Sequence, residues 1–298
     1  MRFGVVLPQF GQWARGPEVR DRLGIMAVSA DRLGYEVLWT ADHVVFPATI
    51  STPYPYGPSL PFSVTDPVLD ALATLAYVAA LTPRIRLGTS VLVLPYRQPI
   101  VLAKELATLD VLSGGRLTLG VASGWLAEEF DLLGIPFRER GARTDEYLAV
   151  LRALWTEDRV TFVGRSVTVR DAVCFPKPVQ RPHPPIWVGG RSRPALRRVA
   201  RFGDGWLAPP PVNLEALAAD VATLRRLAEG EGRDPASIGV ASSGGARSID
   251  DLVERLPALE RIGVTVTGVP VLAWGRSFDH ALELLAQFAE RARLEARP

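Results

Sequence analysis

The fold of this chain is indicated by residues 85–122, which read IRLGTSVLVLPYRQPIVLAKELATLDVLSGGRLTLGVA. A short run at 85–91 precedes a segment at 99–112 whose apolar residues recur at helical spacing. A second apolar run follows at 117–122. The order strand, helix, strand is typical of two parallel strands joined by a crossover helix, and it predicts an α/β protein.

The same alternation continues along the chain in both directions. Strands are expected at 3–8, 35–40, 85–91, 117–122, 186–189, 205–207, 238–242 and 264–268. Helices are expected near 18–34, 68–81, 99–112, 144–156, 193–202, 214–230, 248–261 and 278–293. Eight strand–helix units in 298 residues predict a (β/α)8 TIM barrel. A doubly wound open sheet is the alternative, but no glycine-rich nucleotide turn follows the first strand.

Insertions interrupt this alternation after strands 2 and 4. Residues 44–65 follow the second strand, and residues 125–143 and 158–185 flank the fourth helix. The last of these contains a predicted hairpin, 160–163 with 166–169. Residues 44–65 leave the C-terminal end of a strand, so they must lie on the barrel face that carries functional loops. No internal repeat or low-complexity linker divides residues 1–298, which predicts a single domain.

Composition excludes several classes of function. The 34 basic and 32 acidic side chains leave a formal charge of +2, which gives no electrostatic footprint for nucleic acid. Cys174 is the only cysteine, so no intrachain disulfide is expected. The most apolar helical segment, 68–81, contains Asp70 and is shorter than the roughly 20 residues of a membrane helix. We therefore expect a cytoplasmic protein with neither nucleic acid nor membrane as a partner.

The sequence also lacks the common metal and nucleotide motifs. His43, His183 and His280 lie far apart, and neither CxxC nor HExxH occurs, so no metal site is expected. No Gly-Lys dipeptide and no GxGxxG is present, which argues against a P-loop and against the usual dinucleotide fingerprint.

Asp42 and His43 end the second strand and are candidate catalytic residues. At the mouth of a barrel an imidazole is suited to proton exchange with a bound substrate. Asp42 would either orient this imidazole or cap a turn. The alternative for the pair is an Asx-turn beside a solvated histidine.

Small residues end the next two strands. Thr89 and Ser90 would let a planar ring approach the backbone closely, unless their hydroxyl groups only complete the hydrogen bonds of a turn. Ser123 and Gly124 offer a similarly narrow approach after the fourth strand. Trp125 would then form a wall of the pocket.

Gly189, Gly190 and Arg191 join the fifth strand to a predicted helix start. Exposed N–H groups at a helix N-terminus, together with an arginine, favour an anion such as phosphate, although a Gly-Gly turn is also ordinary loop chemistry. Glu128 and Glu129 are interpreted as carboxylates in the first turn of a helix, where the helix dipole favours them.

Taken together, these stretches resemble the F420-dependent branch of the bacterial luciferase-like superfamily. The matching motifs are LGYEVLW at 33–39 with DH at 42–43, TPRIRLGT at 82–89, LSGGR at 112–116, GW at 124–125 with EF at 129–130, and PKPVQ at 176–180 with GG at 189–190. The resemblance implies a (β/α)8 barrel that binds a flavin-like ring at its C-terminal mouth and forms a homodimer. It also implies an oxidoreductase that transfers a hydride between coenzyme F420 and a small-molecule substrate.

The resemblance further implies roles for individual residues. His43 would donate or accept a proton near the reactive carbon of the ring, oriented by Asp42. Ser90 and Val91, joined by a non-proline cis peptide, would support the back of the ring.

The remaining implied contacts concern the flank of the ring and its phosphate. Ser123 and Gly124 would touch the flank, and Gly189 with Gly190 would hold the phosphate. Sugar-phosphate dehydrogenases of this branch carry a glutamate where Trp125 stands here, and they bind phosphate through lysines. Only two lysines occur in this chain, so a sugar phosphate is not expected.

Two alternatives remain open at this point. One is a two-component monooxygenase that uses reduced FMN and oxygen, because it would share the barrel and the phosphate cradle. The other is a catalytically silent flavin-binding barrel. Aromatic side chains in the 44–65 loop favour a less polar substrate.

Overall fold

Eight parallel strands close into a barrel in the computed structural model, which describes residues 1–209 and 213–295. They are β1 (Arg2–Val6), β2 (Val37–Thr40), β3 (Arg86–Thr89), β5 (Leu117–Ala122), β8 (Ile186–Gly189), β9 (Gly205–Leu207), β10 (Gly239–Ala241) and β11 (Val266–Gly268). Pairing runs from β3 through β2, β1, β11, β10, β9 and β8 to β5, and the β3–β5 pair closes the ring. The predicted TIM barrel is confirmed, and the open-sheet alternative is wrong.

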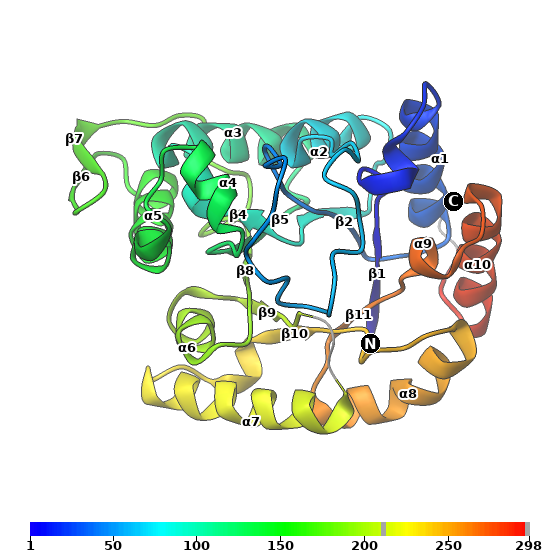
Figure 1. The fold of residues 1–298 in the computed structure, drawn as a ribbon. Helices are drawn as coiled ribbons and strands as arrows, with labels where there is room; N and C mark the ends of the chain where they lie inside the picture. The colour runs from blue at the N-terminus through cyan, green and yellow to red at the C-terminus, as the bar shows by residue number, and fades with distance from the viewer. Residues whose placement is uncertain (210–212, 296–298) are drawn as a thin grey trace.

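Helices surround this barrel (Figure 1). They are α1 (Val19–Arg32), α2 (Ala71–Ala79), α3 (Pro99–Leu112), α4 (Ala127–Leu132), α5 (Arg140–Thr156), α6 (Arg193–Phe202), α7 (Leu214–Gly230), α8 (Ile249–Ile262), α9 (Val271–Trp274) and α10 (Phe278–Arg291). Local chemistry sets several of the starts. The Asp70 carboxylate accepts from the Ala73 N–H at the start of α2, and the Gln98 side chain accepts from the Val101 N–H at the start of α3.

The third strand is not continuous, although the sequence predicted one run over 85–91. β3 ends at Thr89, and a short strand β4 (Leu92–Val93) pairs in parallel with the end of β5. Between them, Ser90 and Val91 are joined by a cis peptide bond, as the resemblance implied.

The insertion after α5 contains the predicted hairpin. It is an antiparallel pair of β6 (Val160–Val163) and β7 (Thr168–Ala172), whose second strand begins two residues later than predicted. α5 begins at Arg140 rather than at 144, and the short helix α4 precedes it. Within the described residues, no helix is long and apolar enough to cross a membrane.

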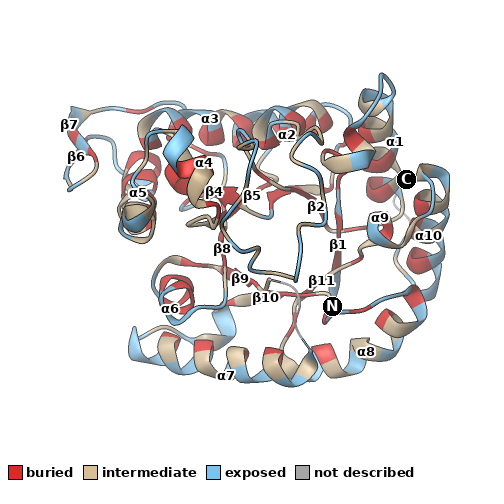
Figure 2. Cartoon of the chain, in the orientation of Figure 1, coloured by how far each residue is buried: buried red, intermediate tan, exposed pale blue. Residues whose placement is uncertain are grey.

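The residues coloured as buried in Figure 2 lie mainly on the barrel strands and along the surrounding helices, and they form one large apolar core cluster. Inside the barrel, a separate small cluster contains Trp39 and Trp187, whose ring centroids are 6.4 Å apart. Two glycines make room for these rings. A Cβ atom on Gly88 would lie 2.3 Å from the Trp39 ring, and one on Gly205 would lie 2.2 Å from the Trp187 ring.

Candidate functional site

The C-terminal ends of the strands surround a cavity of about 390 Å³. Eight residues singled out in the sequence contribute to its wall: Asp42, Ser90, Val91, Ser123, Gly124, Gly189, Gly190 and Arg191. These residues follow β2, β3, β5 and β8, so segments far apart in the sequence meet at one end of the barrel. Tyr56 from the 44–65 loop, Trp125 and Arg140 complete much of the remaining wall.

Two glycines allow close packing in the wall of this cavity. Gly124 has φ +81°, and a Cβ atom there would lie 2.7 Å from the side chains of both Phe130 and Val93. A Cβ atom on Gly189 would lie 2.8 Å from Val91 Cγ1. Glycine at these positions therefore lets the side chains of Phe130, Val93 and Val91 pack directly against the backbone of the wall.

The turn after β8 presents the N-terminus of α6 to the cavity. Gly190 has φ +105°, and its carbonyl accepts a hydrogen bond of 2.7 Å from the buried Trp206 indole N–H. Ser192 caps α6 through its side chain. The Arg191 guanidinium lies 2.9 Å from the Asp220 carboxylate, which offsets part of its charge. The backbone N–H groups of this turn, together with Arg140 on the cavity wall, remain suited to an anion.

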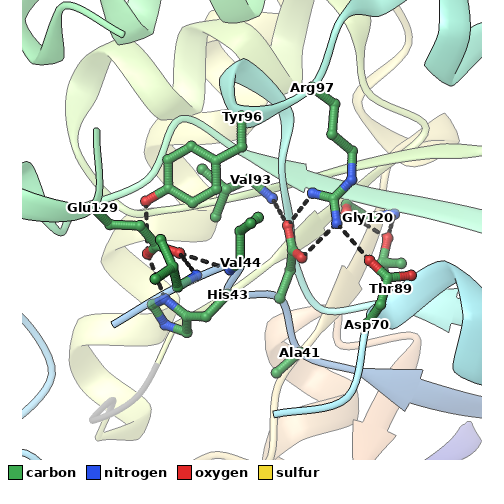
Figure 3. A network of polar contacts seen from close by, with 12 residues as sticks. Ala41, His43, Val44, Asp70, Thr89, Val93, Tyr96, Arg97, Gly120 and Glu129 are labelled. Carbon is green, nitrogen blue, oxygen red and sulfur yellow. Dashed lines mark hydrogen bonds and ion pairs between the residues drawn. The ribbon is translucent and has the colours of Figure 1, made fainter. Parts of the chain in front are cut away.

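His43 pairs with a carboxylate that is distant in the sequence. Its Nδ1 lies 2.7 Å from Glu129 Oε2, and the two side chains are 11% and 0% exposed. Figure 3 shows that three further groups point at Glu129. The Val44 and Val45 backbone N–H groups donate to Oε1 at 2.7 and 3.2 Å, and the Tyr96 hydroxyl donates to Oε2 at 3.0 Å.

Tyr96 is a permanent hydrogen-bond donor in this network. Burial, followed by the charge of the Glu129 carboxylate, raises the pKa of Tyr96 far above its ordinary value. The phenol therefore keeps its proton throughout the working range of the protein, and that proton points to Glu129.

The expectation that Asp42 orients His43 is not supported by these contacts. Both Asp42 oxygens bind the Arg97 guanidinium, at 2.6 and 2.8 Å, and Oδ2 also accepts from the Val93 N–H at 2.9 Å. Successive residues of an extended chain point to opposite sides, so Asp42 and His43 reach different partners. Asp42 ties the end of β2 to the segment after β3, whereas Glu129 holds His43.

Thr89 also lies elsewhere than expected. It is fully buried, donates through its hydroxyl to the Gly120 carbonyl at 2.6 Å, and accepts from the Gly120 N–H at 3.0 Å. The alternative interpretation, a hydroxyl that completes backbone hydrogen bonds, fits Thr89. Ser90 is exposed at the cavity.

The 44–65 loop surrounds His43 with aromatic rings. Ring centroids of Phe46, Trp125 and Phe62 lie 4.6, 6.2 and 6.2 Å from that of His43. Tyr54 packs edge-to-face on Trp125 at 5.4 Å. The region beside the histidine is therefore predominantly apolar.

α4 holds the same loop at a second point. Glu128 accepts from the Ser51 and Thr52 backbone N–H groups and from the Thr52 hydroxyl, at 2.7–2.9 Å. Desolvation opposes the charged form of Glu128, but the Thr52 hydroxyl and the backbone N–H groups outweigh it and lower its pKa to about 2.

Sequence reasoning placed both glutamates correctly in the first turn of a helix, but it missed what they contact. Glu129 and His43 are 86 positions apart, and no local pattern connects them. The available signal was positional, because both residues follow the C-terminal ends of barrel strands.

Among the described residues, no group of His, Cys, Asp and Glu could hold a metal ion.

The mouth fits a planar ring that carries a phosphate. Ser90, Val91, Ser123 and Gly124 could contact such a ring, because they line the cavity. The turn at Gly189–Gly190 could hold the phosphate, because its N–H groups lie at a helix start. Fold and site thus define a (β/α)8 barrel with a cavity suited to a flavin-like group and a histidine–carboxylate pair beside it.

The chain belongs to the luciferase-like monooxygenase family, whose sequence profile matches residues 1–293. Members of this family are oxidoreductases, monooxygenases among them. An uncharacterised protein of Mycobacterium tuberculosis is 34% identical over 245 residues, which are 80% of this chain and 81% of that protein.

Relatives with both kinds of cofactor are present. An F420-dependent glucose-6-phosphate dehydrogenase of Kineococcus radiotolerans is 34% identical over 190 residues, 62% of this chain and 51% of its own length. An FMNH2-dependent dimethylsulfone monooxygenase of Pseudomonas putida is 36% identical over 156 residues, 51% of this chain and 42% of its own length.

Solved structures share the fold along nearly the whole chain. A monooxygenase from Streptomyces bottropensis superposes with a TM-score of 0.77 at 23% identity, covering 97% of this chain and 98% of that one. The F420-dependent tetrahydromethanopterin reductase of Methanopyrus kandleri superposes with a TM-score of 0.74 at 20% identity, covering 99% of both chains.

Proposed function

We propose that this protein transfers a hydride between coenzyme F420 and a small organic substrate. The observation that carries the proposal is the buried His43–Glu129 pair, which lies beside a cavity lined by glycine and small residues. A hydride transfer to or from a carbon–oxygen bond must be accompanied by a proton, and a histidine held by a carboxylate is suited to exchange it. The F420-dependent relatives favour this coenzyme.

Different residues of the chain would bind the coenzyme and transfer the proton. Bound F420 supplies the carbon, C5, that accepts or donates the hydride. Gly189 and Gly190 hold its phosphate, while Ser90 and Val91 support the back of the ring. In the direction of substrate oxidation, His43 accepts the hydroxyl proton as the carbonyl forms, and in the reverse direction it returns that proton.

A second candidate function is that of an FMN-dependent two-component monooxygenase. The dimethylsulfone monooxygenase relative favours it, and the same cavity and turn would hold the flavin phosphate. A silent flavin-binding barrel is a third candidate. For either enzyme, the aromatic rings around His43 favour a substrate of low polarity.

Titration of the purified protein with oxidised F420 and with FMN, followed by fluorescence, tests the proposal. We expect F420 to bind with a dissociation constant in the micromolar range or below. Gly189→Ala provides the site control, because its Cβ would lie 2.8 Å from Val91 Cγ1 and should weaken binding in this cavity. Binding of FMN alone would favour the monooxygenase, and binding of neither would favour the silent barrel.

His43→Ala separates catalysis from binding in the same protein. It should leave the dissociation constant of the coenzyme unchanged and slow turnover by about 10²–10⁴-fold, the usual scale for acid–base catalysis.

We further propose that residues 1–298 form one domain and that the protein is a cytoplasmic homodimer.

A further inference from the structure

We propose that Glu129 is a positioning residue that keeps a proton on His43 Nδ1, so that Nε2 is the atom that exchanges a proton with the substrate. The inference rests on the proposed function only in assigning the proton to a substrate. The tautomer itself follows from the contacts of the free protein.

The two oxygens of Glu129 have different partners. Oε1 receives two backbone N–H groups, from Val44 and Val45, and backbone N–H groups can only donate. Oε1 must therefore be an acceptor in every protonation state of the pair. Oε2 faces the Tyr96 hydroxyl at 3.0 Å and His43 Nδ1 at 2.7 Å.

The short contact between His43 and Glu129 contains one proton, and the other donors to Glu129 decide which atom carries it. Tyr96 keeps its own proton and donates it to Oε2. With three donors already directed at it, the carboxylate is best satisfied as an anion, which can only accept. A carboxylate is also a weaker base than an imidazole. The proton of the 2.7 Å contact therefore belongs to Nδ1.

The orientation of the His43 ring is fixed by the same carboxylate that holds its backbone. Glu129 is fully buried and also binds the backbone of Val44 and Val45, the two residues that directly follow His43. The same carboxylate thus fixes both the imidazole ring and the chain that carries it. With Nδ1 engaged, Nε2 is the ring nitrogen left for proton exchange.

Substitution of Glu129 by glutamine should move the His43 proton from Nδ1 to Nε2. Because Oε1 must stay an acceptor for two N–H groups, the glutamine oxygen is held there and its NH2 group faces His43 and Tyr96. An NH2 group donates, so Nδ1 must become the acceptor and the proton must move to Nε2. Glu129→Gln should therefore invert the tautomer of His43.

The readout is ¹⁵N NMR of protein labelled at histidine, recorded at a pH where the imidazoles are neutral. The chain has three histidines, and His43→Asn assigns the signal of interest. The other two are internal standards. His183 Nδ1 faces the Pro184 carbonyl at 2.9 Å and must donate, whereas His280 Nδ1 lies 3.2 Å from the Arg276 N–H and must accept.

In the wild-type protein the ¹⁵N signals of His43 should show a protonated Nδ1, as in His183. In Glu129→Gln they should show an unprotonated Nδ1, as in His280. Tyr96→Phe, which leaves the carboxylate, and Asp131→Asn, an exposed position of α4, should both keep the wild-type pattern. A wild-type His43 with its proton on Nε2 overturns the proposal, as does a folded Glu129→Gln protein with an unchanged tautomer. Failure of F420 to bind would instead refute the proposed function and leave this result intact.

Discussion

Asp42 and His43 are neighbours in the sequence, yet their side chains have different partners. Asp42 is fully buried in its contacts with Arg97 and the Val93 N–H, and the Arg97 side chain is only 15% exposed. His43 contacts Glu129 instead. At this scale the structure separates a residue that holds two segments together from one that is paired with a buried carboxylate.

Asp42→Asn should therefore reduce stability. Removal of the Asp42 charge leaves the largely buried Arg97 guanidinium with only the exposed Asp70 carboxylate, so the loss should approach the roughly 3–5 kcal/mol of a broken buried ion pair. The matched control is Asp70→Asn, which removes the other carboxylate of Arg97 at a position whose side chain is 54% exposed, so about 1 kcal/mol or less is expected. Urea unfolding measures both. Similar small losses in the two variants would contradict the importance of the Asp42–Arg97 pair.

The sequence could predict which side chains meet at the cavity, but it could not predict how they pair. Ser90, Gly124 and Gly189 were found because the ends of parallel strands meet at one face of a barrel. Glu129 was assigned only to a helix start, because its contact with His43 depends on how α4 packs against the segment that follows β2. That arrangement is tertiary and leaves no periodic signal.

α4 is a short helix that binds the 44–65 loop at two points. Glu129 binds the start of the loop at Val44 and Val45, and Glu128 binds its middle at Ser51 and Thr52. One helical turn thus holds the segment that surrounds the histidine with aromatic rings.

Glu128→Gln should loosen this loop, because the ionised carboxylate is the stronger acceptor. Hydrogen exchange of the Ser51 and Thr52 amides should become several-fold faster at pH 7, while Asp131→Asn leaves it unchanged. The folded protein lowers the pKa of Glu128 from 4.5 to about 2. The stabilisation is therefore complete above about pH 4.5 and is lost as the pH falls toward 2.

Urea unfolding between pH 7 and pH 3 checks this dependence. The difference in unfolding free energy between the wild type and Glu128→Gln should be constant above about pH 4.5 and should shrink below it. A difference that grows on acidification would refute the assigned contacts.

Elements with strong periodicity were predicted well, and irregular ones were not. Every predicted strand and helix has a counterpart, because apolar spacing reports which face is buried. The break of the third strand at Ser90–Val91 was visible only through the resemblance, since Thr89 to Val93 are all compatible with a strand. α4 was expected only as a helix start at Glu128 and Glu129, because six residues are too few to show a helical period.

At the scale of the whole molecule, barrel closure depends on the pair β1–β11, which joins Arg2 to Val266 in distant parts of the chain. Within the part of the chain that the structure describes, the eight barrel strands leave no free edge, so a contact with another copy would use the outer helices, the loops or the β6–β7 hairpin. α2 and α3 present an apolar groove of about 590 Å³ on this outer surface. Val101 and Leu112 of α3 are 56% and 71% exposed there.

The proposed homodimer should form through this groove, because association would bury apolar side chains that now face solvent. Val101→Glu introduces a charge at the groove and should convert the dimer to a monomer in analytical ultracentrifugation. Val163→Glu is the matched control, since Val163 is 78% exposed in the β6–β7 hairpin, away from α3. Arg97 lines the groove and also binds Asp42, so the monomer should in addition show altered coenzyme affinity. A Val101→Glu protein that remains a dimer would exclude this face, whereas a monomeric wild-type protein would refute the dimer itself.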